Sequence, residues 1–163
     1  MLKTSNIDLQ NAMHLALKLL GIRSHSREEL KQKLLKKGYT IERIEPVLEK
    51  LTTQDLLDDY VFGSELIRSY SKRKPVGKLK IRNELRKKGV SETIIVKLLN
   101  EYNNLTHCWL AAEKKVRTLH GTSKPNKKIK LARFLHNRGF EWQEIQPVIK
   151  HFFKDSSEFE SLS

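Results

Sequence analysis

The sequence contains a single cysteine, Cys108, and one cysteine cannot form an internal disulfide. This excludes the small secreted domains that depend on disulfides and favours a reducing compartment. His107 lies beside Cys108, but no further cysteine or suitably spaced histidine completes a metal site, so we expect Cys108 to be a small buried apolar residue. No apolar run is long enough for a signal peptide or a membrane helix. We therefore expect a cytoplasmic protein with no metal, no cofactor and no membrane association.

Proline and glycine are scarce, with four and seven residues, and no stretch alternates Val, Ile and Thr as a strand does. Leu, Lys, Glu and Arg, which favour helices, are abundant instead. The fold class that we expect is therefore all-α. With 163 residues the chain is long enough for one domain, or for a few small modules that share a core, and too short for two independent enzymes.

Three glycines stand where helices are expected to end, Gly38, Gly89 and Gly139, and they lie 51 and 50 residues apart. Such self-similarity is typical of repeat proteins, whose units pack against their neighbours. The sequence predicts three tandem three-helix repeats (1–54, 55–103 and 104–154) in an elongated, curved array, with a frayed tail at 155–163. Four sets of apolar residues recur in register with the glycines: Leu30, Ile81 and Leu131; Leu34, Leu85 and Leu135; Ile44, Ile95 and Ile145; Val47, Leu98 and Val148.

Polar residues mark several expected helix starts. Ser26 followed by Glu29 fits a capping box, and Asp58 or Asp59 can cap the first helix of the second repeat. Pro46 is expected to bend the first turns of its helix or to delay the helix start. Two adjacent carboxylates at a helix start are better explained as caps than as a general acid and base, and no glycine loop that could cradle a phosphate is present. We therefore expect no enzymatic activity.

Positive charge is concentrated in one part of the chain. Residues 1–66 contain ten basic and ten acidic side chains, whereas residues 67–163 contain 22 basic and nine acidic ones and so carry the whole formal charge of +13. Between Arg68 and Lys88 ten basic residues stand with Glu84 alone. Such a surface favours a nucleic acid, an acidic protein face or both as partner over a merely solvated face. A membrane-surface helix is disfavoured, because the basic helices lack a Trp or Phe face for insertion.

The helix that ends at Gly89 indicates how this charge is presented. At about 100° per residue, Ile81 and Leu85 share one side, which packs, and the basic residues spread over the other. Leu79 lies among the charges, where it packs on a neighbouring repeat or touches a partner. The candidate binding residues are basic side chains of this region and of a second cluster in the third repeat: Lys72, Arg73, Lys74, Lys78, Lys80, Arg82, Arg86, Lys87, Lys124, Lys127, Lys128, Lys130 and Arg133.

Four aromatic residues near the basic clusters could stack on the bases of a nucleic-acid strand: Tyr70, Trp109, Phe134 and Trp142. All four stand at apolar positions of expected helices. We therefore expect them in the core rather than at a binding surface.

Three blocks of the sequence occur in a specific order and spacing. Ser26 to Gly38 fits Ser-x-x-Glu-Leu-x-x-Lys-Leu-x-x-Lys-Gly, Leu57 to Phe62 fits Leu-Asp-Asp-x-x-Phe, and Gly77 to Val90 fits Gly-x-x-Lys-Ile-Arg-x-Glu-Leu-Arg-x-Lys-Gly-Val/Ile. Over about residues 10–152 the chain resembles the RecX family, small bacterial proteins that modulate the recombinase RecA. That family usually has a glycine and an aromatic residue before Leu-Asp-Asp, where this chain has Asp55-Leu56, so the turn between the first two repeats is expected to differ.

The resemblance implies a cytoplasmic regulator, without enzymatic activity, that takes part in DNA repair, DNA recombination and the SOS response. It implies binding in the helical groove of the RecA filament on single-stranded DNA, and inhibition of recombination, ATP turnover and coprotease activity. We also expect a monomer that binds duplex DNA weakly. The resemblance leaves open whether filament nucleation, growth or stability is affected, and which repeat contacts protein and which contacts DNA.

The alternative is a general nucleic-acid-binding helical module without a dedicated protein partner. In that interpretation the three-helix units act as degenerate helix-turn-helix elements. Salt dependence separates the two hypotheses, because a protein that contacts only phosphates loses affinity steeply as the salt concentration rises.

Overall fold

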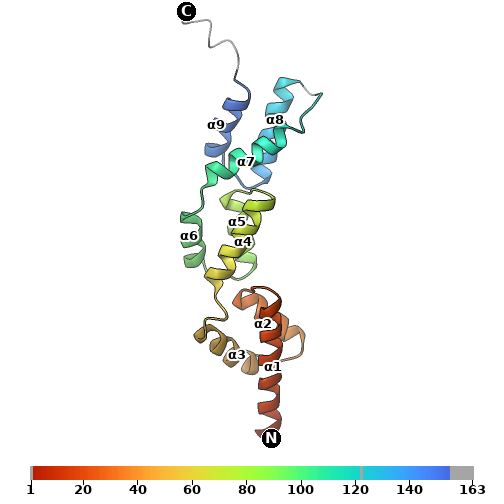
Figure 1. The fold of residues 1–163 in the computed structure, drawn as a ribbon, viewed down its shortest axis with the longest axis vertical. Helices are drawn as coiled ribbons and strands as arrows, with labels where there is room; N and C mark the ends of the chain where they lie inside the picture. The colour runs from red at the N-terminus through yellow and green to blue at the C-terminus, as the bar shows by residue number, and fades with distance from the viewer. Residues whose placement is uncertain (1, 122, 155–163) are drawn as a thin grey trace, which may run out of the picture. The chain divides into compact units, whose positions relative to one another are not determined.

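The computed structural model describes residues 2–121 and 123–154, with side chains from residue 7 onward. Over this range it contains nine α-helices and no strand (Figure 1), so the all-α expectation is confirmed. The tail at 155–163 lies outside the described residues. The helices are α1 (Leu2–Ile22), α2 (Arg27–Lys36), α3 (Ile41–Thr53), α4 (Asp59–Arg73), α5 (Lys78–Lys87), α6 (Glu92–Asn100), α7 (Asn104–Val116), α8 (Lys124–Asn137) and α9 (Trp142–Phe152).

The chain divides into two compact units. Unit 1 consists of residues 1–68 and 83–101, and unit 2 consists of residues 69–82 and 102–163. Helices α4 and α5 therefore contribute residues to both units. The bounds of the three repeats, which follow sequence register, and their elongated, curved arrangement stay predictions.

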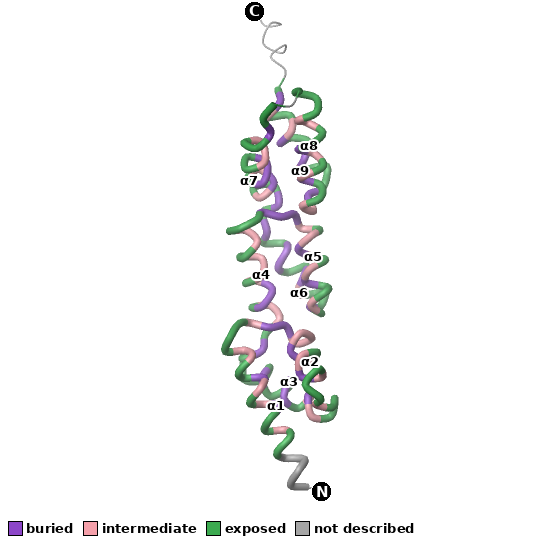
Figure 2. The backbone as a smooth tube through the Cα atoms, turned by 90° about the vertical axis from the view of Figure 1, so that its right-hand side faces the viewer, coloured by how far each residue is buried: buried purple, intermediate pink, exposed green. Residues whose placement is uncertain are grey.

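Each unit contains one group of three mutually packed helices. In unit 1, α1, α2 and α3 pack pairwise around a buried apolar cluster, and in unit 2, α7, α8 and α9 do the same (Figure 1). Along both groups buried and exposed residues alternate (Figure 2), as expected for helices with one packed side. The four sets of apolar residues in register lie in the interior, and none of the twelve side chains is more than 5% exposed. The repeat pattern in the sequence is therefore a pattern of core positions.

The helix ends follow the sequence with some differences. Gly38, Gly89 and Gly139 have left-handed backbones, with φ of 92°, 74° and 85°, and each is the second residue after the last residue of its helix, where a stop glycine was predicted. Helix α3 begins at Ile41, so Pro46 does not delay its start.

One junction in unit 1 joins the start of α2 to the start of α4 and to the residue after the end of α5. The Ser26 hydroxyl accepts a hydrogen bond from the Glu29 amide (3.1 Å) and donates one to the Lys88 carbonyl (2.5 Å), after the end of α5. Asp58 caps α4, because its carboxylate accepts from the Tyr60 amide (2.7 Å). The neighbouring Asp59 caps α2 instead, by accepting from the Arg27 amide (2.8 Å). The adjacent carboxylates are thus caps, as expected, and they serve two different helices.

A second junction repeats this arrangement in unit 2 with amides in place of carboxylates. Asn103 caps α7 by accepting from the Thr106 amide (3.0 Å). Asn104 accepts from the Lys78 amide (2.9 Å) at the start of α5, as Asp59 does at the start of α2. The Gly77 amide donates to the Arg138 carbonyl (2.8 Å) beyond the end of α8. Both junctions therefore satisfy helix-terminal backbone groups that would otherwise need water.

Candidate nucleic-acid and protein interface

The candidate binding residues are unevenly shared between the units. Eleven of the thirteen belong to unit 2, and only Arg86 and Lys87 belong to unit 1. By sequence, unit 2 has seventeen basic and six acidic side chains, a difference of +11, whereas unit 1 has fifteen and thirteen, a difference of +2. The charge asymmetry of the sequence thus follows the structural division.

The two candidates in unit 1 are engaged in ion pairs. The Arg86 guanidinium lies 2.9 Å from the Glu92 carboxylate, and the Lys87 ammonium lies 3.2 Å from that of Glu84. Such exposed pairs add little stability, but they reduce the positive field at these residues. The positive surface of the described residues therefore centres on unit 2.

The first basic segment of unit 2 has a fixed backbone at its middle. Residues 75–77 are buried, and the Tyr102 hydroxyl donates a hydrogen bond to the Val76 carbonyl (2.6 Å). Burial raises the pKa of Tyr102, which keeps this donor protonated. A Cβ atom at Gly77 would overlap the Gly139 carbonyl, so no larger residue fits there without movement. The three candidates before residues 75–77 are exposed and the three after them are half-buried: Lys72, Arg73 and Lys74, then Lys78, Lys80 and Arg82.

The second basic segment is α8, and its C-terminal end lies against the first turn of α5. The Leu79 amide donates to the Gly139 carbonyl (3.3 Å), and a Cβ atom at Gly139 would meet the Lys80 side chain. From this end α8 extends for roughly 20 Å, at 1.5 Å per residue. Its basic candidates comprise three exposed and two half-buried side chains: Lys124, Lys130 and Arg133, then Lys127 and Lys128. The first turn of α5 and the C-terminal end of α8 thus meet within unit 2, and Leu79 at this contact is 42% exposed.

Three of the four aromatic residues are half-buried, in partial agreement with the core expectation: Tyr70, Trp109 and Phe134. Lys115 and Arg138 lie over the Phe134 ring, with the charged atoms 5.4 Å and 4.7 Å from its centroid. Trp109 packs edge-on against His151, with centroids 4.7 Å apart. The two cations lie over the Phe134 ring, where a base would have to stack.

Trp142 is 61% exposed, so the expectation that it lies in the core is wrong. It is the first residue of α9 and stands three residues after Gly139. The residues three positions after the other two repeat glycines, Ile41 and Glu92, are exposed as well. This position therefore faces outward. In the sequence, Glu92 at this position of the second repeat indicates the exposure.

A pocket of about 340 Å³ lies beside Trp142 between α8 and α9. Arg133 is the only one of its lining residues that was predicted as a binding residue. The lining residues are Ala132, Arg133, His136, Asn137, Trp142 and Ile145.

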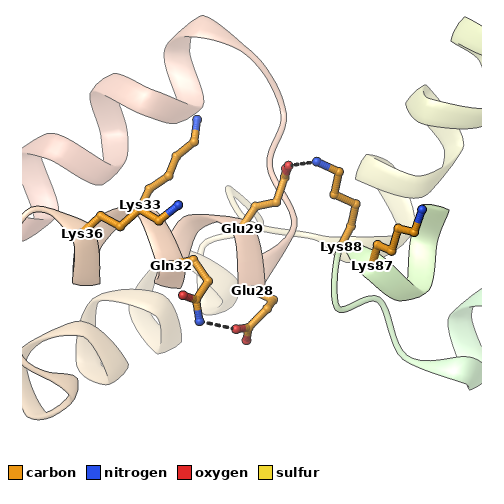
Figure 3. A pocket seen from close by; sticks show the side chains of 7 residues that line it. All are labelled: Glu28, Glu29, Gln32, Lys33, Lys36, Lys87 and Lys88. Carbon is orange, nitrogen blue, oxygen red and sulfur yellow. Dashed lines mark hydrogen bonds and ion pairs between the residues drawn. The ribbon is translucent and has the colours of Figure 1, made fainter. Parts of the chain in front are cut away.

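A second polar pocket, of about 220 Å³, lies in unit 1 between α2 and the end of α5 (Figure 3). Lys88 points toward Glu29, at 2.5 Å, and Gln32 donates to Glu28, at 2.8 Å. The remaining lining residues are Lys33, Lys36 and Lys87. This pocket cannot be recognised in the sequence, because it depends on a contact between residues almost sixty positions apart.

Two titratable groups at this junction have shifted pKa values. Burial alone would raise the pKa of Glu29, but hydrogen bonds from Arg23 and Lys88 outweigh it and bring the pKa to about 2. Burial lowers the pKa of His25, which is 2% exposed. Its Nε2 atom lies 2.7 Å from the Lys33 ammonium, a contact that suits a neutral imidazole acting as acceptor. The Glu29 carboxylate is thus paired with Arg23 and Lys88 and does not complete the capping box that the sequence predicts.

Cys108 is buried, as expected, and burial raises the pKa of its thiol to about 12, so the reactive thiolate is disfavoured. In the part of the chain that the structure describes, no three His, Cys, Asp or Glu residues are grouped so as to hold a metal ion. None of the described helices combines the length and apolar character needed to cross a membrane.

Comparison with known proteins identifies the family. Sequence models of the first, second and third three-helix domains of RecX match residues 12–51, 58–99 and 103–149. The chain is 61% identical over 139 residues to the regulatory protein RecX of Pelodictyon phaeoclathratiforme, covering 85% of this chain and 87% of the relative. It is 47% identical over 146 residues to that of Chlorobium limicola, covering 90% and 92%.

Solved structures agree on the fold. The crystal structure of RecX from Lactobacillus salivarius superposes with a TM-score of 0.80 over 90% of this chain and 97% of that one, at 24% identity. The repeat register, the three-helix groups and the matches along most of the sequence lead to one conclusion: the chain belongs to the RecX family of regulatory proteins.

Proposed function

We propose that this protein binds the RecA filament on single-stranded DNA and mainly inhibits its recombinase, ATPase and coprotease activities. Membership of a family of regulatory proteins supports a regulator. The observation that carries the proposal further is the charge of unit 2, with seventeen basic and six acidic side chains. A filament of protein and single-stranded DNA offers phosphates and acidic side chains together, and both attract such a surface.

Unit 2 has two properties that suit this role. The start of α5 contacts the C-terminal end of α8 through Leu79, Lys80 and Gly139, so both basic segments belong to one packed unit. The backbone in the middle of its first basic segment is buried and hydrogen-bonded at Val76 and Gly77, which limits the ordering that binding would require. We propose that the protein acts as a monomer, binds duplex DNA weakly and regulates ATP turnover without hydrolysing ATP itself.

Co-sedimentation tests the proposal. The protein is mixed with RecA filaments on single-stranded DNA, with bare single-stranded DNA and with bare duplex, between about 50 mM and about 200 mM salt. We expect it to sediment with the filaments over the whole range, because contacts with protein add a component that salt weakens less. Binding to bare DNA should fall steeply.

The basic surface also favours a second candidate function, a general nucleic-acid-binding module. That function predicts equal binding to bare and RecA-coated strands and the same steep salt dependence for both. This result would replace the proposal. ATP hydrolysis by the protein without RecA, tracking the protein through purification, would contradict the expectation that it is not an enzyme.

A further inference from the structure

Trp142 differs from the other tryptophan of the chain in its surroundings. Trp109 packs against His151 and Phe152, whereas Trp142 makes no ring contact with any described residue and is 61% exposed. A tryptophan is the largest apolar side chain, and leaving most of it in water forgoes the stabilisation that burial would give. Tryptophan, with an apolar ring and a polar N–H, is enriched where a protein meets a partner.

The pocket beside Trp142 combines a flat aromatic wall with polar groups on one helix. Ala132 and Ile145 supply apolar surface, and α8 supplies a guanidinium, an imidazole and an amide from Arg133, His136 and Asn137. A base needs an aromatic face to stack on, donors and acceptors for its edge, and a cation for the adjoining phosphate. Trp142 provides the aromatic face, His136 and Asn137 provide groups for the base edge, and Arg133 provides the cation.

No carboxylate lines this pocket. The acidic residues nearest in sequence, Glu141 and Glu144, form a capping box at the start of α9. The Glu144 carboxylate accepts from the Glu141 amide at 2.9 Å, and that of Glu141 accepts from the amide of Glu144. Both negative charges are therefore directed at backbone amides, and the positive end of the α9 dipole offsets them.

We propose that this pocket binds one unpaired base of a single-stranded DNA, stacked on Trp142. Arg133 contacts the adjoining phosphate, and His136 and Asn137 hydrogen-bond the base edge or the sugar. A duplex does not offer such a base, because its bases are stacked on one another. The charge of α8, which has five basic side chains and no acidic one, favours a nucleic acid over an apolar protein surface as the occupant. The inference rests on the proposed function, since it specifies how the strand is held.

Tryptophan fluorescence can report binding at this pocket. The variant Trp109→Phe leaves Trp142 as the only tryptophan of the chain, so its emission reports this pocket alone. The probes are an oligothymidylate of about twelve nucleotides and an abasic strand of equal length, which carries the phosphates without bases. We expect saturable quenching by the oligothymidylate, and much less by the abasic strand at equal occupancy measured by anisotropy.

Substitutions test the energetics in the full chain. Trp142→Ala should weaken oligothymidylate binding by roughly five-fold to one hundred-fold and leave abasic-strand binding almost unchanged. Trp142→Phe should retain most of the affinity, because the ring remains. The matched control is Ile41→Ala, at the equivalent exposed position of the first repeat, and it should bind like the parent protein. Thermal melting verifies that each variant is folded.

The outcomes separate this inference from the proposed function. Unchanged oligothymidylate affinity in Trp142→Ala would overturn the stacking site. If that variant binds the strand normally but inhibits RecA more weakly, Trp142 contacts protein instead. Equal quenching by the abasic strand would also overturn it. Trp142-dependent strand binding in a protein that has no effect on RecA would support this inference and contradict the proposed function.

Discussion

Asp55 is the only non-glycine residue with a left-handed backbone in the described part of the chain, with φ of 56°. It follows Gln54, the C-cap of α3, and the Leu56 amide beyond it donates to the Leu51 carbonyl (2.9 Å). A turn of this kind at a helix end is most easily formed by glycine. The sequence indicated an altered turn, because related proteins usually have glycine before Leu-Asp-Asp. Asp55 nevertheless adopts the backbone region that glycine favours.

We predict that Asp55→Gly stabilises the protein by up to about 1 kcal/mol, because glycine adopts this conformation without steric strain. Asp55→Ala should not stabilise, since alanine keeps the strain and loses the polar side chain. Urea unfolding of the three proteins measures the difference. A glycine variant that unfolds at lower urea concentration than the parent would show that the Asp55 side chain outweighs its backbone strain.

Two titratable groups at the α2 junction, the buried His25 and the half-buried Glu29, predict a loss of stability in acid. The pKa of His25 is lowered from 6.5, so folding favours the neutral imidazole, and its contribution is present above pH 6.5 and lost as the pH falls through the folded pKa. The pKa of Glu29 is lowered from 4.5 to about 2, so its contribution is lost between these values. The melting temperature should therefore fall in two stages below pH 6.5.

Melting curves across this pH range test the assignment. His25→Gln should remove the upper stage and leave the lower one. The control is His14→Gln, exposed on α1, which should melt with the pH dependence of the parent. Loss of the upper stage in the control but not in His25→Gln would contradict this account.

At the scale of elements, the two junctions use equivalent caps that differ in charge. Burial raises the pKa of Asp59, and the Arg27 amide only partly offsets this, so ionised Asp59 destabilises the fold relative to a neutral acceptor. Asn104, buried in the equivalent role, carries no charge. We predict that Asp59→Asn is as stable as the parent or more stable at neutral pH, whereas Asp59→Ala loses roughly 1 kcal/mol with the cap.

The reciprocal variant Asn104→Asp should lose stability at neutral pH and regain part of it in acid, when the carboxylate is protonated. Denaturant unfolding of all three variants at two pH values gives the comparison. If Asp59→Asn loses as much stability as Asp59→Ala, the negative charge itself holds the junction and the argument from burial is wrong.

The helices and their core positions could be predicted from the sequence, whereas the contacts between helix ends could not. Leu34 and Ile44 belong to an apolar register that recurs three times, and its periodicity predicts the core positions that the structure shows. Ser26 and Lys88 meet only because two helix ends are brought together, and no local pattern records such a contact. The apolar character of Trp142 predicts a core position, whereas Glu92 at the equivalent position of the second repeat indicates the exposure that the structure shows.

At the scale of the whole molecule, charge rather than fold distinguishes the two units. Both contain a group of three packed helices, but one carries a formal +2 and the other +11. The sequence showed that the charge was uneven, and the structure assigns Arg86 and Lys87 to the balanced unit, where acidic partners hold them. The central claim is therefore that unit 2, and not unit 1, provides the charge for binding to RecA filaments.

Two matched charge reversals test this claim. In unit 2, Lys72→Glu, Arg73→Glu and Lys74→Glu change exposed residues at the end of α4. In unit 1, Lys18→Glu, Lys37→Glu and Lys50→Glu change exposed residues near the ends of α1, α2 and α3, all outside the polar pocket of Figure 3. Both triple variants change the net charge equally and disturb helix dipoles similarly, so a difference between them reports location. Melting temperatures control for folding.

The measurement is the inhibition of RecA-dependent ATP turnover on single-stranded DNA as a function of the concentration of each variant. We predict that the unit 2 variant inhibits roughly ten-fold or more weakly than the parent protein, and that the unit 1 variant inhibits like the parent. Equal inhibition by the two folded variants, or a greater loss in the unit 1 variant, would contradict the assignment of the binding charge to unit 2.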